Sequence, residues 1–178
     1  RFYKEVLVFS NYNLLSSSAL IFRSQGSNML INFFFGATTN AAYFYAYTLQ
    51  NYVNQFVGIF DSASGPQITQ HVGARQVDTA IQLARRSCRI CILLFLVIFF
   101  PLWSELEFLL GLWLGSKMPP EAVVMSRWTL VIAAVAVTSA GLSQLINAFG
   151  RIKWYKIEFS VLYLLCLVAG WLLFRSES

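Results

Sequence analysis

The sequence predicts an all-α membrane protein, and its composition, its apolar segments and the placement of its charges all support that class. Hydrophobic residues make up 57% of the 178 residues and charged residues only 12%, with a mean hydropathy of +0.60. Soluble domains contain about 45–50% apolar and about 25% charged residues, so the composition indicates helices buried in lipid. We expect a single transmembrane helical domain over residues 1–178.

Five segments are apolar over nearly the length that a membrane helix needs, which is about 20 residues. They cover residues 11–35, 37–60, 90–109, 123–149 and 157–174. Gly36-Ala-Thr-Thr-Asn40 predicts a short external turn, so the first two segments are expected to form an antiparallel hairpin. The sequence Ser62-Ala-Ser-Gly65-Pro66 disfavours a continuous helix and predicts that the second helix ends there. A cytoplasmic loop, 62–89, then follows, and its amphipathic part is either an interfacial helix or a solvated linker.

The basic residues are distributed unevenly over this five-span arrangement. The net charge is +5, and most Lys and Arg residues fall at the N-terminus, within 62–89 or between the last two spans. Only Lys117, Arg127 and Arg175 fall on the other side. This positive-inside pattern places the N-terminus in the cytoplasm. Topology therefore explains the basic charge, and nucleic acid is not an expected partner.

One helical face of the second span is polar along its length. Its residues follow one another at steps of three or four, as on one side of an α-helix: Asn40, Tyr43, Tyr47, Asn51, Asn54, Gly58 and Asp61, with Gln50 beside them. Lipid cannot satisfy such groups, so this face points at other helices or at water. It forms either a helix interface held by amide hydrogen bonds or a cavity wall that contacts hydrophilic cargo, and we favour the cavity wall. Asp61 could act as a gate, couple transport to a proton or sodium gradient, or merely be a helix-end carboxylate.

Arg23 lies near the middle of the first span, where insertion scales penalise its charge by roughly 2.5–3.5 kcal/mol. A guanidinium can hold a phosphate through two parallel hydrogen bonds, which predicts contact with a diphosphate or an acidic sugar. The alternative is a structural ion pair with a carboxylate. Asn28 is a further candidate for substrate contact, because it forms a second polar side of the same helix together with Gln25 and Asn32.

Motifs typical of catalysis or of a metal site are absent from the sequence. It contains no Gly-rich phosphate loop, no HExxH and no nucleophile elbow. His71 has no evident partner in the sequence, and Cys88-x-x-Cys91 lacks a second ligand pair. With Cys166 the count of cysteines is odd, so we expect packing rather than a disulfide framework. We expect neither enzymatic activity nor a bound cofactor.

Four stretches, taken in their order and spacing, resemble the Wzx-type polysaccharide or O-antigen flippases of the multidrug/oligosaccharidyl-lipid/polysaccharide exporter superfamily. They are Asn32-Phe-Phe-Phe-Gly36-Ala-Thr-Thr-Asn40-Ala-Ala, Gly65-Pro66-Gln67-Ile68-Thr69, Leu112-Trp113-Leu114-Gly115 and Ala148-Phe-Gly150-Arg-Ile-Lys153. The resemblance covers almost the whole chain and implies part of a six-helix bundle of a MATE-like exporter fold. The five spans would be the seventh to eleventh of twelve, so the chain is expected to be a fragment of the C-terminal half.

The resemblance also implies a function. Such transporters flip an undecaprenyl-diphosphate-linked oligosaccharide from the cytoplasmic to the periplasmic leaflet of the bacterial inner membrane, by alternating access, in lipopolysaccharide biosynthesis. The implied partners are this lipid-linked oligosaccharide, membrane lipids and the remaining helices of the parent transporter. Cationic cavity residues are a theme of the family, and Arg23 fits that theme.

Three other functions stay open. A cation-coupled multidrug antiporter of the same superfamily would need acidic intramembrane residues, and Asp61, directly at the end of the second span, is the only carboxylate in residues 11–61. A membrane-embedded polysaccharide polymerase would need a large extramembrane catalytic loop, and no loop predicted here reaches domain size. A structural membrane subunit would have little use for Arg23 or for the polar face of the second span.

Overall fold

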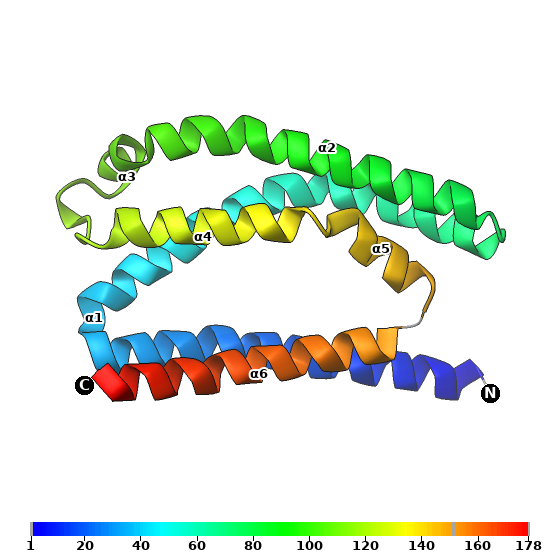
Figure 1. Cartoon of the computed structure of the whole chain (residues 1–178), viewed down its shortest axis with the longest axis horizontal. Coiled ribbons are helices and arrows are strands. Elements are labelled where there is room, and N and C mark those ends of the chain that lie inside the picture. The colour runs from blue at the N-terminus through cyan, green and yellow to red at the C-terminus, as the bar shows by residue number, and fades with distance from the viewer. Residues whose placement is uncertain (1, 151, 178) are drawn as a thin grey trace. The chain divides into compact units, whose positions relative to one another are not determined.

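The computed structural model describes residues 2–150 and 152–177, and the side chains of residues 10–150 and 155–175. Over these residues the chain is almost entirely helical and contains no strand, which confirms the all-α class (Figure 1). The elements are α1 (Phe2–Gly73), α2 (Val77–Ser104), α3 (Leu106–Leu114), the short 3-10 helix η1 (Gly115–Lys117), α4 (Ala122–Val137), α5 (Ala140–Ala148) and α6 (Ile152–Glu177).

Two helices in the described part of the chain are long and apolar enough to cross a membrane. They are α2 and the Tyr155–Arg175 segment of α6, and α4 with α5 would be a third if this bent pair forms one span. Membrane-helix character is thereby supported for the last three predicted segments. The two segments in α1 carry more Ser, Asn and Gln and do not meet the same requirement, so the count of five spans stays a prediction.

Helix α1 contains one break in its helical backbone, at Gly36. This residue has φ of +82° and ψ of 177°, a conformation that glycine adopts without the steric cost of a Cβ atom. The break falls where the sequence predicts a turn, but it is narrower, because residues 37–40 are already helical. Whether the two parts of α1 form a hairpin stays a prediction.

The predicted helix end at 62–66 is wrong. Pro66 lies inside α1, which continues to Gly73. A proline removes one backbone hydrogen bond from a helix. That loss is outweighed by packing, because Ile68 is completely buried with Ala80 and Ala84 of α2. The segment expected as a loop, 62–89, is therefore helical except for a tight turn between α1 and α2.

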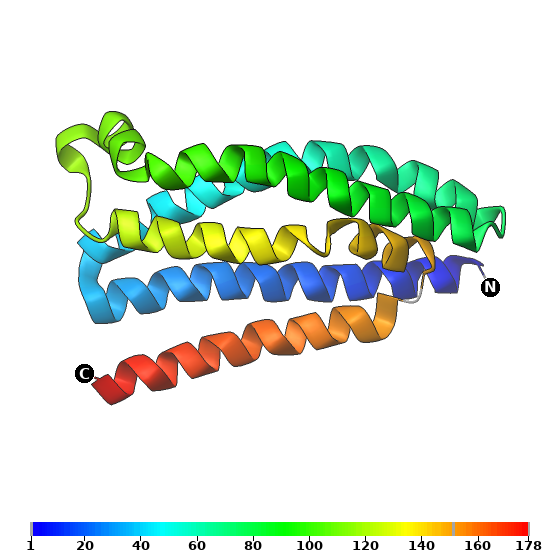
Figure 2. The same ribbon diagram turned by 45° about the horizontal axis from the view of Figure 1, so that its top comes forward.

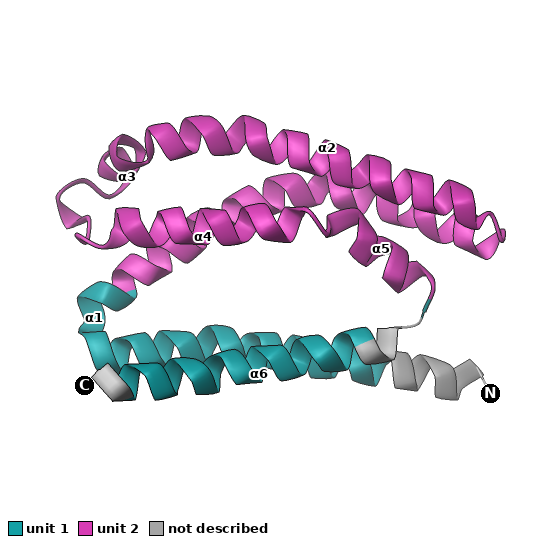
Figure 3. Ribbon diagram, viewed as in Figure 1, with its two compact units in different colours: residues 1–40, 150–178 teal, residues 41–149 magenta. Residues whose placement is uncertain are grey.

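The chain divides into two compact units, residues 1–40 with 150–178 and residues 41–149 (Figure 3). In the first unit the N-terminal part of α1 and α6 run side by side, as the views of Figures 1 and 2 agree. Their contacts include Phe35 and Phe174, whose ring centroids lie 4.9 Å apart with the planes at 89°. Helix α6 is therefore packed along α1 and not surrounded by lipid on all sides.

The second unit packs the rest of α1 against α2, α3 and α4. Its core contains Ala42 and Val53 of α1, Phe95 of α2, Leu110 of α3 and Leu130 of α4, all buried. A smaller cluster around Ile68 includes side chains of α5. These contacts fix which side of α1 faces the protein within this unit.

The predicted span 123–149 is bent by 45° between α4 and α5. At the bend, the Thr138 hydroxyl donates to the Val135 carbonyl at 2.7 Å, and the Ser139 hydroxyl donates to the Ala136 carbonyl at 3.0 Å. Hydroxyl groups that bond to backbone carbonyls in this way compete with the helical pattern and bend helices. The bend places α5 where it packs on α2.

Candidate functional site

Arg23 is half-buried in the first unit, on the side of α1 that faces α6. Its guanidinium carbon lies 5.1 Å from the centroid of the Tyr163 ring, within the range of about 6 Å that is typical of a cation–π contact. Among the described residues, no carboxylate pairs with Arg23 and no acceptor receives its N–H groups. A guanidinium has five N–H donors, so the ring face leaves its hydrogen-bonding capacity for a ligand.

A pocket of about 240 Å³ opens beside the Arg23–Tyr163 pair, between the N-terminal part of α1 and the start of α6. It is lined by Ser16, Ser17, Leu20, Tyr155, Lys156, Phe159 and Tyr163. Lys156 brings a second positive charge to this pocket, two helical turns or about 11 Å along the axis from Tyr163. Lys156 lines the pocket itself, whereas Arg23 lies next to it, over the ring of the lining residue Tyr163. Hydroxyl groups, one cation in the pocket and a second cation beside it are suited to an anion that carries more than one charge.

Sequence reasoning missed both partners of Arg23 in this site. The positive-inside pattern assigns Lys156 only to the basic residues between the last two spans, and Tyr163 is not among the candidate residues that the sequence indicates. A signal was present, because Tyr155, Phe159 and Tyr163 recur every four residues and so share one side of α6. Their neighbouring ring centroids lie 4.7 and 6.0 Å apart.

Asn28 does not belong to this pocket. It follows Arg23 by five residues and therefore points about 140° away around the helix. Its side chain is half-buried. The structure therefore does not place Asn28 and Arg23 in one site, and the contact of Asn28 with substrate stays a prediction.

The polar face of the second predicted span lies beside the packed side of α1 in the second unit. Its members Tyr43, Tyr47, Gln50, Asn51 and Asn54 are all half-buried. The Tyr43 and Tyr47 rings are stacked, with centroids 6.1 Å apart and planes at 17°. The core of this unit is filled by the adjacent alanine and valine side chains of α1, so the polar face is not the main packing surface there. Such an arrangement is compatible with a cavity wall.

Asn40 is the member of this face that lies nearest to the break in α1. Its side-chain oxygen is buried, and no described group donates a hydrogen bond to it. An unpaired buried carbonyl oxygen costs free energy comparable to that of a lost hydrogen bond. The amide of Asn40 is therefore a second place where this chain has hydrogen-bonding capacity left over.

Asp61 lies at the meeting point of α1, α2 and α5. Its Oδ2 atom accepts a hydrogen bond from Gln144 Nε2 at 3.1 Å, and its Oδ1 atom accepts one from Ser87 Oγ at 3.5 Å. The Ser64 and Ser87 hydroxyl oxygens lie 2.9 Å apart beside it. Because α1 continues to Gly73, the interpretation of Asp61 as a helix-end carboxylate is wrong. Its role as a gate or coupling group stays a prediction.

The cysteine and histidine side chains take part in packing and in a turn. Cys88 and Cys91 are free thiols, half-buried and buried, and Cys166 is exposed. His71 Nδ1 lies 2.8 Å from Gln76 Oε1 across the turn between α1 and α2, so it has a local partner that the sequence did not reveal. In the part of the chain that the structure describes, no three His, Cys, Asp or Glu side chains are grouped so that they could hold a metal ion.

No family model matches the chain, and neither a curated protein nor a solved structure matches it. Its function is therefore inferred from its own residues and contacts.

Proposed function

We propose that the chain is part of a polysaccharide-export transporter, which flips an undecaprenyl-diphosphate-linked oligosaccharide from the cytoplasmic to the periplasmic leaflet of the bacterial inner membrane. The observation that carries this proposal is the environment of Arg23. Its guanidinium lies over the Tyr163 ring, beside a serine-lined pocket to which Lys156 contributes a second cation. The resemblance of four sequence stretches to Wzx-type flippases supports the same function.

The chemistry of the Arg23 pocket fits the diphosphate of such a cargo. The Tyr163 ring holds one face of the guanidinium, so the planar edge with its N–H groups can pair with phosphate oxygens in a bidentate manner. Lys156 acts as a mobile point charge for the remaining negative charge. The hydroxyl groups of Ser16 and Ser17 add donors that do not change the charge of the pocket.

The polar face of α1 supplies the groups that a glycan needs. The stacked rings of Tyr43 and Tyr47 offer flat surfaces for sugar rings, and the amides of Gln50, Asn51 and Asn54 offer both donors and acceptors. In this proposal the N-terminus is cytoplasmic, the chain crosses the membrane five times, and the transporter alternates between inward-open and outward-open states.

The test is rescue of polysaccharide export in cells that lack the parent protein. Full-length wild type is compared with Arg23→Ala, Arg23→Lys and Arg23→Glu, and protein abundance is measured together with surface polysaccharide. Arg127→Ala is the matched control, because Arg127 also lies over an aromatic ring, that of Trp103, at 5.8 Å, but belongs to the second unit.

We expect normal abundance of all variants. Export is lost in Arg23→Ala and Arg23→Glu, partly kept in Arg23→Lys, and unchanged in Arg127→Ala. Full export by every Arg23 variant would remove this arginine from the mechanism and with it the main support for the proposal.

A cation-coupled multidrug antiporter is the second candidate, and Asp61 is the observation that favours it. Its carboxylate is held by neutral donors, and among the described side chains no cation neutralises it. The discriminating measurement is dye efflux by the parent protein under an imposed proton or sodium gradient. Gradient-driven efflux that Asp61→Asn abolishes would favour the antiporter, whereas efflux that is absent from wild type would exclude it.

A further inference from the structure

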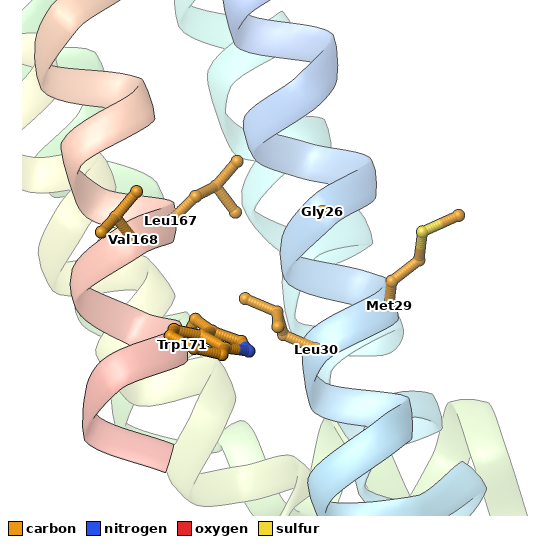
Figure 4. Close-up of a pocket in the computed structure, with 6 residues that line it drawn as sticks. All are labelled: Gly26, Met29, Leu30, Leu167, Val168 and Trp171. Atoms are coloured by element: carbon orange, nitrogen blue, oxygen red, sulfur yellow. The ribbon is translucent and has the colours of Figure 1, made fainter. Parts of the chain in front are cut away.

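A second pocket lies along the same helix pair, one turn beyond the Arg23–Tyr163 contact. It has a volume of about 370 Å³ and is lined by Gly26, Met29, Leu30, Leu167, Val168 and Trp171 (Figure 4). The first pocket ends at Leu20 on α1 and at Tyr163 on α6, and the second begins at Gly26 and Leu167, six and four residues further on. The two pockets therefore follow one another along one helix pair with the Arg23–Tyr163 contact between them, and we call this stretch the seam.

In the second pocket Leu167 packs directly over Gly26. A Cβ atom at position 26 would lie 2.9 Å from Leu167 Cδ2, the end of a flexible side chain that would have to shift. Figure 4 shows Leu167 pointing toward Gly26, while Leu30 and Trp171 point toward each other. The six lining residues include no charged side chain. This part of the seam is suited to hydrocarbon.

The seam thus changes character along its length. At the start of α6 it contains Lys156 and serine hydroxyls, in the middle the Arg23 guanidinium, and beyond that only apolar side chains. From Lys156 to Trp171 it extends over about 22 Å of α6. Its ligand should be an amphiphile with a multiply charged anionic head and a hydrocarbon tail, because such a molecule matches both ends at once.

We infer that this seam binds the cargo lipid itself, with the diphosphate at Arg23 and Lys156 and the first units of the prenyl tail in the pocket beside Gly26. The inference rests on the proposed function and assigns the tail a place. Two cations at the head favour a diphosphate over the single charge of a common anionic phospholipid. A tail gains little by leaving lipid for an apolar pocket, so the head supplies the affinity and the pocket fixes the tail's direction.

The experiment is photocrosslinking in the full-length parent protein, purified into vesicles of phosphatidylethanolamine and phosphatidylglycerol. The photoreactive residue p-benzoylphenylalanine replaces Val168 in the pocket or, as the control, Val161. These two valines lie on the same helix with similar exposure, 54% and 50%, but Val161 lines neither pocket. The probe is radiolabelled undecaprenyl diphosphate, and each variant must elute as a monodisperse protein before it is used.

We expect about tenfold more probe captured at position 168 than at position 161, and about tenfold less capture at 168 when Arg23→Gln is added. Tenfold corresponds to about 1.4 kcal/mol of binding free energy. The inference is overturned by equal capture at the two positions, by capture unaffected by Arg23→Gln, or by capture of phospholipid or another segment of the parent protein at 168 instead of the probe.

The photocrosslinking experiment can be distinguished from the export assay of the proposed function, because capture of the probe requires binding but no transport. Specific capture at position 168, combined with full export by all Arg23 variants, would retain the lipid site and remove the flippase proposal. Absence of specific capture, combined with loss of export in Arg23→Ala, would remove the seam as the tail site and leave the flippase proposal standing.

Discussion

Replacing Gly141 with alanine tests the packing of α5 on α2 most directly. A Cβ atom at Gly141 would collide with the backbone carbonyl oxygen of Ala84 and would lie 3.1 Å from Cys88 Sγ. A carbonyl oxygen inside α2 cannot turn aside as the end of a side chain can. The whole of α5 must therefore move away from α2, and this movement also strains the hydrogen bond between Gln144 and Asp61.

The expected loss in the free energy of unfolding of Gly141→Ala is the sum of three contributions. Overpacking of a tight contact costs about 1–3 kcal/mol. Weakening of the Gln144–Asp61 hydrogen bond adds about 1 kcal/mol, whereas alanine regains about 1 kcal/mol over glycine in helix propensity. Gly141→Ala should therefore lower the free energy of unfolding by about 2 kcal/mol.

The assay is reversible unfolding of the purified parent protein in mixed micelles with increasing denaturing detergent. Gly58→Ala is the control, because it makes the same change inside α1 with no atom within 4 Å of the new Cβ, and it should leave stability unchanged or raise it by up to about 1 kcal/mol. Stability of Gly141→Ala equal to that of wild type would refute the close approach. Adding Cys88→Ala to Gly141→Ala should not restore stability, because the Ala84 carbonyl remains in the way.

Three further substitutions test other contacts. Asp61→Leu should cost about 1–3 kcal/mol in the same unfolding assay, and more than Asp61→Asn, which keeps an acceptor oxygen for its partners on α2 and α5. Thr129→Val should cost about 1 kcal/mol, because the buried hydroxyl is shared between a backbone carbonyl of α1 at 3.1 Å and the Ser126 carbonyl of its own helix at 3.0 Å, whereas the exposed Thr138→Val should cost less than half as much. Tyr163→Leu should lower polysaccharide export by freeing Arg23, whereas Tyr163→Phe keeps the ring and should keep export; equal export by both would contradict the role of the cation–π contact.

The parts of the fold that the sequence predicts well are those governed by local periodicity. On the side of the second predicted span opposite its polar face, Ala42, Leu49 and Val53 pack into the core of their unit, whereas Phe56 and Phe60 are exposed. Periodicity does not show, however, how much tertiary packing stabilises a helix. Pro66 is a local signal to end a helix, and it is overridden by burial of Ile68 against α2. The bend between α4 and α5 went unpredicted because hydroxyl groups disturb a helix less than proline does.

In the candidate site, too, local sequence indicates some residues, whereas others come close only through tertiary packing. Arg23 is recognisable from sequence because a charge in the middle of an apolar segment is a local anomaly. Its partners, Tyr163 and Lys156, lie at the other end of the chain and come close only when α6 packs along α1. The same holds for Asp61, whose hydrogen-bond donors come from two helices that follow it. Periodicity can mark one side of a helix, as the spacing of Tyr155, Phe159 and Tyr163 does, but which helix that side meets depends on tertiary contacts.

Arg23 and Asp61 of α1 differ in what their neighbours require of them. Half-buried Gln144 donates to the Asp61 carboxylate at 3.1 Å and buried Ser87 donates to it at 3.5 Å, so the hydrogen bonds of these two donors are enough to explain why an acceptor stands there. Among the described side chains, the polar interaction of Arg23 is the cation–π contact with the Tyr163 ring. A cation–π contact contributes about 0.5–2 kcal/mol, less than the roughly 2.5–3.5 kcal/mol that a central charge costs an inserted helix. In the proposed five-span arrangement, where Arg23 lies inside a membrane helix, stability accounts for the carboxylate but not for the guanidinium, and a bound anion would offset the difference. For this reason the proposed function rests on Arg23 and not on Asp61.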